Sequence, residues 1–284
     1  MSLNPTQLNR AELYVKTVFR KAMSEETDDV AKDLYAVTPN KSGFARVLNL
    51  TAVPGMRRWE SERRPGTFSF SVEMQKIGKW EQSVAINGED IEDDDLGIYK
   101  TAIEEMALEN KLIYSALSIE AINKGFTTKS ADGYNFFSAE HKNLQTGDLT
   151  AANYEAARLK VQTQKTENGK PFGYLVDTLI VGPTMESKAR AIIEKENLAG
   201  GESNTNYHTA KIKVVPQITD NSWYVACLGR KIKPVEVFER RKTGPLRQIL
   251  KDRQEDQDVY TWGTDGRFDA TYANYRLIAG SVGS

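Results

Sequence analysis

One helical pattern in this sequence is long for a chain of 284 residues. Between Leu96 and Lys124, apolar residues recur at offsets of three, four and seven, as on one face of an α-helix: Ile98, Ala102, Ile103, Met106, Ile113 and Leu117. A helix of about 27 residues spans roughly 40 Å at 1.5 Å per residue. Such a helix is longer than most in globular proteins, so we expect it to be a central strut along which the other elements are arranged.

An acidic run lies immediately in front of this helix: Glu89-Asp90-Ile91-Glu92-Asp93-Asp94-Asp95. Carboxylates stabilise the positive end of a helix dipole. The run is therefore predicted to cap the long helix and to act as a hinge before it, through Glu89, Asp90, Asp93, Asp94 and Asp95. A metal site is the alternative, since hard cations bind several carboxylate oxygens. The run, however, lacks the Asp-x-Asp-x-Asp-Gly spacing of a calcium loop and has no nearby histidine to support zinc.

The stretch from Gly43 to Ile86 has strand-like residues that carry unusual charge. Polar and apolar residues alternate from Thr67 to Val72, as in a half-exposed strand, and Pro65-Gly66 marks a break before it. We interpret the stretch as a long β-hairpin, which has little core of its own and is expected to lie on another surface. Candidates for contacts with another subunit are the charged residues and the tryptophan in its middle: Arg57, Arg58, Trp59, Glu60, Glu62, Arg63 and Arg64.

Helical and strand patterns alternate in the second half of the chain. Helices are predicted over residues 148–164 and 185–195, and strands over 174–183, 211–215, 223–228 and 235–238. Strand, turn and helix in this order begin an α/β or α+β layer. The tail from Asp258 to Ile278 is expected to form two β runs turned at Thr264-Asp265-Gly266. A further amphipathic helix, ending at about Lys21, need not belong to a compact core because a polar arm follows it.

Composition narrows the classes of function. Lys plus Arg number 38 and Asp plus Glu 39, a net charge of −1 that argues against a dedicated nucleic-acid binder. The single cysteine, Cys227, cannot form an internal disulfide and is expected to be a small buried residue, which suits a reducing cytoplasm. No stretch approaches the roughly 20 apolar residues that cross a bilayer. The chain is therefore expected to be soluble, unexported and without a membrane partner.

The sequence contains only weak patterns of catalytic residues. The two histidines, His141 and His208, stand without a Gly-x-Ser-x-Gly motif, so a catalytic triad is not expected. Gly200-Gly201 lacks the phosphate-binding Gly-x-x-x-x-Gly-Lys pattern. The cluster Arg240-Arg241-Lys242 is interleaved with acids, which favours ion pairs between subunits over phosphate contacts. We predict no catalytic residues, no metal and no cofactor.

The block from Ile86 to Tyr99 resembles the Mu-like prophage major head subunit family, together with Gly125-Phe126 and the stretch from Asp132 to His141. Trp59 and Trp80 fit the hairpin region of that family, and the tail is similar in character. The resemblance implies an α+β chain with the Hong Kong-type fold of tailed-phage capsid proteins. It divides the chain into an N-terminal arm (1–43), an extended hairpin loop (44–86), a peripheral domain with a long spine helix (87–147), an axial domain (148–239) and returning strands of the peripheral domain (240–284).

The same resemblance implies a structural protein and not an enzyme: the major capsid protein of a tailed bacteriophage or prophage. Copies would form pentamers and hexamers of an icosahedral shell around double-stranded DNA, touched without sequence specificity. A separate scaffolding protein, a maturation protease and a portal are implied as partners, and the shell would be assembled in the host cytoplasm and form the virion capsid. Three alternatives remain open: an encapsulin-like nanocompartment shell, a metal-dependent hydrolase using Asp93 to Asp95, and a tail or baseplate component.

Overall fold

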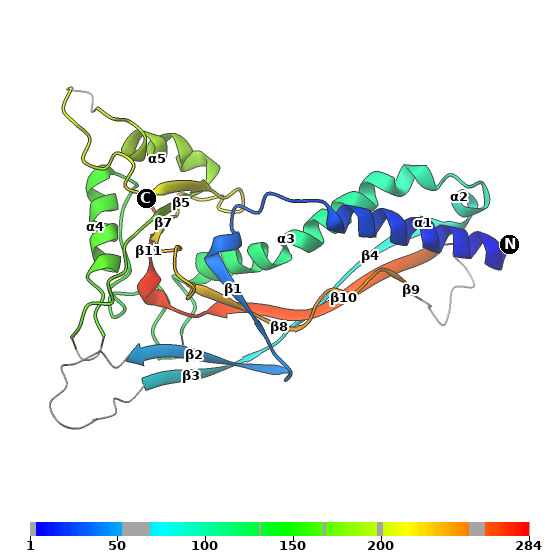
Figure 1. Ribbon diagram of the computed structural model, residues 1–284, viewed down its shortest axis with the longest axis horizontal. Helices are drawn as coiled ribbons and strands as arrows, with labels where there is room; N and C mark the ends of the chain where they lie inside the picture. The colour runs from blue at the N-terminus through cyan, green and yellow to red at the C-terminus, as the bar shows by residue number, and fades with distance from the viewer. Residues whose placement is uncertain are drawn as a thin grey trace, which may run out of the picture.

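The computed structural model describes residues 4–52, 69–130, 132–166, 169–197, 201–249 and 259–283. Figure 1 shows an elongated molecule in which a long helix and a long sheet run side by side and end in a block of shorter elements. The long helix is α3 (Lys100–Lys124), preceded by the 3-10 turn η2 (Leu96–Tyr99). The helix predicted from the apolar spacing is therefore confirmed, with its first turn wound as a 3-10 helix. The remaining short turns are η1 (Lys32–Leu34), η3 (Pro183–Met185) and η4 (Tyr275–Leu277).

The N-terminal helix α1 (Pro5–Ser24) packs along α3 (Figure 1), although the sequence did not require it to belong to a compact core. A capping box fixes its start, because the Asn4 side chain accepts from the Thr6 N–H and Gln7 reaches back to the Asn4 N–H. At its other end, Lys111 of α3 donates to the carbonyl oxygens of Ala22 and Glu25, at 2.8 and 3.0 Å. The helix joins the core because its apolar stripe finds α3: Ala11, Val15, Phe19 and Ala22 are buried with Ile103, Met106, Ala107 and Trp262.

The long sheet has the order β1 (Tyr35–Pro39), β8 (Val235–Arg241), β10 (Val259–Tyr272) and β4 (Lys79–Asn87), and β9 (Arg247–Ile249) also pairs with β10. Only the β1–β8 pair among these is parallel. The turn predicted at Thr264-Asp265-Gly266 is wrong, because β10 passes straight through these residues and stays paired with β4. Gly266 serves close packing instead, since a Cβ there would lie 2.5 Å from the Phe268 ring.

The predicted β-hairpin is confirmed in its described part. Strands β2 (Phe44–Ala52) and β3 (Ser69–Lys76) pair antiparallel, with Phe44 opposite Lys76. Ala45 and Val47 of β2 are buried against Phe238 of β8. The hairpin is thus anchored at its root and extends from the sheet (Figure 1).

The block at the other end of the molecule is built on a second sheet, in the order β11 (Ile278–Ser281), β7 (Trp223–Ala226), β5 (Thr178–Val181) and β6 (Lys211–Val214). Helices α4 (Ala151–Gln162) and α5 (Glu186–Ile193) belong to the same block (Figure 1). Thr150 caps α4 by accepting from the Asn153 N–H at 3.2 Å. Cys227 is buried here as predicted, and its burial raises the pKa of its thiol.

An aromatic cluster joins the two parts: Phe136, Phe137, Tyr224 and Tyr272 are buried in one core with Ile119 and Ile122 of α3. His141 binds two residues of the loop that follows α3. Its ring nitrogens lie 3.0 Å from the Phe136 carbonyl oxygen and 2.6 Å from an Asp132 carboxylate oxygen. This histidine is buried and hydrogen-bonded, as expected of a loop residue with a structural role. Within the described ranges, no helix is long and apolar enough to span a bilayer.

Candidate functional site

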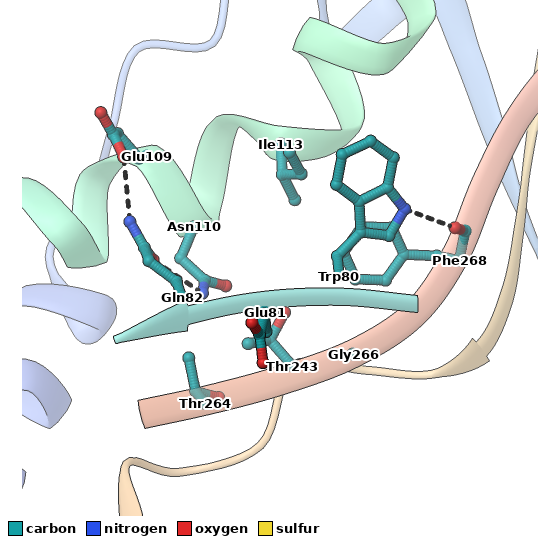
Figure 2. Close-up of a pocket in the computed structure, with 10 residues that line it drawn as sticks. All are labelled: Trp80, Glu81, Gln82, Glu109, Asn110, Ile113, Thr243, Thr264, Gly266 and Phe268. Atoms are coloured by element: carbon teal, nitrogen blue, oxygen red, sulfur yellow. Dashed lines mark hydrogen bonds between the residues drawn. The ribbon is translucent and has the colours of Figure 1, made fainter. Parts of the chain in front are cut away.

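A hollow of about 180 Å³ opens between α3 and the long sheet at the root of the hairpin. Figure 2 shows side chains converging on it from β4, from α3 and from β10. The residues that line it are Trp80, Glu81, Gln82, Glu109, Asn110, Ile113, Thr243, Thr264, Gly266 and Phe268. The lining combines aromatic and aliphatic side chains with amides, hydroxyls and two carboxylates, so the hollow offers both apolar and polar contacts.

Trp80 forms one wall of the hollow and is 37% exposed. Its indole stacks nearly parallel to the Phe268 ring, with centroids 6.3 Å apart, and its Nε1 donates to the Phe268 carbonyl oxygen at 2.9 Å (Figure 2). Phe268 in turn meets Tyr114 of α3 edge to face, with centroids 4.9 Å apart. The Tyr114 hydroxyl donates to Glu239 of β8 at 2.6 Å, and burial together with that carboxylate raises the pKa of Tyr114. A continuous aromatic path therefore ties the hairpin root to α3.

The opposite wall of the hollow is polar. Gln82 donates to a Glu109 carboxylate oxygen at 2.9 Å and accepts from the Asn110 amide at 3.4 Å (Figure 2). Glu81 adds a second carboxylate to the lining. An aromatic wall facing amides and carboxylates suits an aromatic or positively charged side chain of another protein surface.

Asp269 connects the hairpin root to β10. Its carboxylate accepts hydrogen bonds from the backbone N–H groups of Ala270 and Gly78 and from the Gln75 side chain. Gly78 sits tightly there, since a Cβ would lie 3.2 Å from the Trp80 Nε1. Burial raises the pKa of Asp269, and the nearby negative charge of Glu120 adds to that effect.

This raised pKa predicts a pH dependence of stability. The folded chain binds a proton on Asp269 at a higher pH than the unfolded chain does, so the contribution of this group to the free energy of unfolding falls as pH rises from 3.8 through the folded pKa. Asp269→Asn removes the titration. In urea unfolding over a pH series that starts near 3.8, the variant should therefore gain stability relative to the parent as pH rises, and then level off. Asp28→Asn, at an exposed position, is the control. Parallel stability curves for the Asp269 variant and the parent would contradict the prediction.

The acidic run does not cap the long helix, which corrects that part of the prediction. Glu89 and Asp90 lie in the first turn of a separate short helix, α2 (Gly88–Glu92), and Asp93 ends it. Asp95 precedes η2 without a side-chain cap, and α3 begins after Tyr99, again without one. The four residues of η2 separate the acidic run from α3, and the first turn of α3 contains no acidic residue.

The carboxylates of the run have other partners within the chain. Asp90 accepts from the Tyr99 hydroxyl, and that hydroxyl accepts from the Asn87 N–H at 3.3 Å. Asp94, with φ +59°, lies 3.3 Å from the Arg10 guanidinium of α1. In the described part of the chain, no three His, Cys, Asp or Glu side chains are grouped closely enough to hold a metal ion.

Other predicted contact residues fall in two groups. The hairpin residues lie outside the described residues: Arg57, Arg58, Trp59, Glu60, Glu62, Arg63 and Arg64. Arg241, expected to pair with another subunit, instead contacts Asp265 of its own chain, and Arg247 binds the same carboxylate at 3.0 Å. Strand pairing places them together, because β8 and β9 both flank β10. Sequence reasoning missed Phe268 and Asp269, whose only signal was alternation within a strand of the tail.

The profile of one protein family, described as the Mu-like prophage major head subunit gpT, matches residues 8–150 and 144–218. The Mu-like prophage FluMu major head subunit of Haemophilus influenzae is 24% identical over 231 residues, which cover 80% of this chain and 58% of that protein. The major capsid protein of Escherichia phage Mu is 34% identical over 127 residues, which cover 44% of this chain and 40% of that protein. The chain thus spans about half the length of these relatives.

Solved structures share the architecture. A chain from the procapsid of bacteriophage JBD30 matches with a TM-score of 0.60 and 17% identity, over 99% of this chain and 77% of that one. A virus-like particle from Pyrococcus furiosus matches with a TM-score of 0.57 and 13% identity, over 95% and 98% of the two chains. Microbacterium phage Oxtober96 gives a TM-score of 0.57 at 12% identity, over 92% of both chains. These likenesses confirm the α+β Hong Kong-type capsid fold expected from the sequence.

Proposed function

The chain belongs to the Mu-like prophage major head subunit family, and from that premise we propose that it is the major capsid protein of a tailed bacteriophage or prophage. In this role it self-assembles into an icosahedral shell that encloses double-stranded DNA. The observation that carries the proposal is the family match over residues 8–218, together with a capsid fold across the described chain. Such a protein functions by assembling into a closed shell, so its function depends on how neighbouring copies contact and orient each other.

The division of the chain into assembly parts supports this role. The axial domain, residues 148–239, corresponds to most of the block built on β5, β6 and β7, and supplies the contacts within pentamers and hexamers. The peripheral domain is residues 87–147 with returning strands from 240–284, and it carries α3 as its spine. The last strand of that range, β11, instead pairs with β7 in the other block. The N-terminal arm is residues 1–43 and the extended hairpin loop is 44–86. Many modest interfaces used repeatedly then hold the shell together without one tight pair.

The hairpin acts as the lock between neighbouring subunits. Its root is held by the long sheet, where Ala45 and Val47 are buried against Phe238, and the strands that extend from this root need a further surface. The next subunit offers one where its α3 and β4 form the hollow beside Trp80. Mixed charge in the middle of the hairpin sets the register, because exposed ion pairs add little energy singly but wrong pairings are penalised.

The partners follow from the same role. A separate scaffolding protein would direct curvature, a maturation protease would process the shell, and a portal would occupy one vertex. The packaged DNA is touched weakly and without sequence specificity. Assembly takes place in the cytoplasm of the bacterial host, and the finished protein resides in the virion capsid.

Negative-stain electron microscopy of the purified full chain tests the proposal. Closed shells of uniform diameter are expected, either from the chain alone or after co-expression with a scaffolding protein from the neighbouring genes. Tubes or open rings would indicate a tail or baseplate component. Persistent monomers under both conditions would overturn the capsid role.

A shell with a cargo other than a genome is the second candidate. One observation supports it: the chain shares its fold with the virus-like particle of Pyrococcus furiosus over 95% of this chain and 98% of that one. The nucleic-acid content of shells purified from infected or induced cells separates the two. Protected double-stranded DNA supports the phage role, whereas shells filled with protein support a nanocompartment.

A further inference from the structure

A second hollow, of about 520 Å³, lies where the loop after α3 meets the end of α4 and η4. Eleven residues line it, and four of them are basic, from separate stretches of the sequence: Lys142, Lys160, Lys165 and Arg276. Glu140 is the one acidic residue of the eleven. The whole chain carries a net charge of −1, whereas the lining of this hollow has four basic residues to one acidic residue.

The lysines of this basic hollow have no carboxylate partner in the described ranges. No Asp or Glu oxygen described lies within 4.0 Å of the Nζ atoms of Lys142, Lys160 or Lys165. Lys142 and Lys165 are exposed and Lys160 is half-buried. Among the described residues, no carboxylate within 4.0 Å competes with an anion for these three ammonium groups.

The floor of the basic hollow is held rigidly. Arg276 is 7% exposed, and its guanidinium lies 4.4 Å from the centroid of the Tyr275 ring and 5.3 Å from that of Phe172. Tyr275 stacks on His141 with centroids 3.9 Å apart, and Gln164 donates to the His141 carbonyl oxygen at 2.9 Å. A guanidinium fixed in this way loses little conformational freedom when it meets an anion.

We propose that the basic hollow is a contact site for the phosphates of the double-stranded DNA backbone. The assignment rests on the proposed capsid function, in which DNA is the polyanion the shell encloses. Guanidinium and ammonium groups bind phosphate oxygens without reading bases, so the contact is independent of sequence. It places the face of the subunit that carries the hollow toward the interior of the shell. A contact made through a few basic residues in one hollow lets the shell touch DNA without gripping it along its whole inner surface.

The acidic run of a second copy is the competing occupant, and the structure disfavours it. Asp90 and Asp94 already bind Tyr99 and Arg10 of their own chain. An incoming acidic run would have to give up those partners. DNA phosphates have no such partners to lose, and their binding only releases condensed counterions.

The test measures binding of a fluorescent duplex DNA to the unassembled full chain by anisotropy over a salt series. The triple variant Lys142→Gln, Lys160→Gln, Lys165→Gln removes three charges from the hollow. The control Lys32→Gln, Lys211→Gln, Lys231→Gln removes three from exposed positions that do not line it. The hollow variant should bind about tenfold more weakly, and its salt slope should fall by about 0.9 for each phosphate that the variant no longer neutralises. The control should stay within about twofold of the parent.

Equal weakening of DNA binding in both variants, or in neither, would overturn the inference. Lysine-dependent binding of a peptide of residues 86–99, without lysine-dependent DNA binding, would assign the hollow to a second copy instead. Inorganic phosphate at constant ionic strength should compete weakly, because a single anion releases few counterions. Strong competition would point to a free phosphate site. Shell formation is scored separately by microscopy, so shells with unchanged DNA binding reject the hollow alone, and absence of shells from the parent chain rejects the proposed function.

Discussion

Reversing the four arginines of the hairpin should abolish shells while leaving folded subunits. The variant is Arg57→Glu, Arg58→Glu, Arg63→Glu, Arg64→Glu, at positions that lie outside the described residues. In the proposed lock, the hairpin lies on a neighbouring subunit whose hollow carries two carboxylates, Glu81 and Glu109. Reversal turns complementary pairs into like-charge pairs, which cost several kcal/mol in total when they are held together. Microscopy should show no closed particles, and circular dichroism and the urea midpoint should match those of the parent.

Net charge alone must be excluded as the cause. Each reversal changes the charge by two, so four change it from −1 to −9. A matched control with the same total is Lys32→Glu, Lys195→Glu, Lys211→Glu, Lys231→Glu, at exposed positions away from the hairpin. The control should still form shells. Normal particles from the arginine variant, or an equal absence of shells from both, would remove the hairpin charges from the mechanism.

Phe268→Ala should destabilise the subunit by about 3 to 5 kcal/mol, the usual cost of deleting a buried phenyl ring. The ring is 2% exposed and packs with Leu117 and Val237, between Trp80 and Tyr114. Its removal leaves a cavity that opens onto the hollow and deprives Trp80 of its stacking partner. Urea unfolding should show the lower midpoint, and tryptophan emission of the folded state should shift to the red as Trp80 becomes more exposed to water.

Phe268→Leu is the matched control, since it keeps most of the volume while removing the ring. It should cost less than about 1.5 kcal/mol if filling the site is what matters. The two variants also separate packing from assembly. If the leucine variant is stable but forms shells poorly, the stacked pair itself orients the hairpin. Equal stability of the alanine and leucine variants would contradict the assigned role of Phe268 as a packing anchor.

Patterns within single segments of the sequence were sufficient to predict the elements whose formation depends on neighbouring residues. The spacing of Ile103, Met106 and Leu117 predicted α3, because an amphipathic stripe is a property of one segment. Alternation predicted the hairpin strands, and the helical pattern over residues 148–164 predicted α4. The resemblance around the acidic run led to the family and the fold, both confirmed by comparison.

The tail shows where local patterns fail. Thr264-Asp265-Gly266 has the residues of a turn, yet β10 runs through it, since backbone pairing with β4 extends on both sides. The local preference of these residues for a turn stabilises less than an unbroken ladder of hydrogen bonds to β4. That partner strand lies about 180 residues away in the sequence. The acidic run fails similarly, because its carboxylates find Arg10 and Tyr99 and not the start of α3.

The sequence alone thus determined the long helix, the hairpin and the membership of a family. Only the tertiary structure decided which residues share a surface. The hollow at Trp80 draws on three elements, and the basic hollow collects Lys142, Lys160, Lys165 and Arg276 from stretches with no common motif. Helix and strand periodicity report burial within a segment, whereas a contact between distant segments depends on how their surfaces pack. A site assembled from single residues on several elements therefore leaves no pattern in the sequence to read.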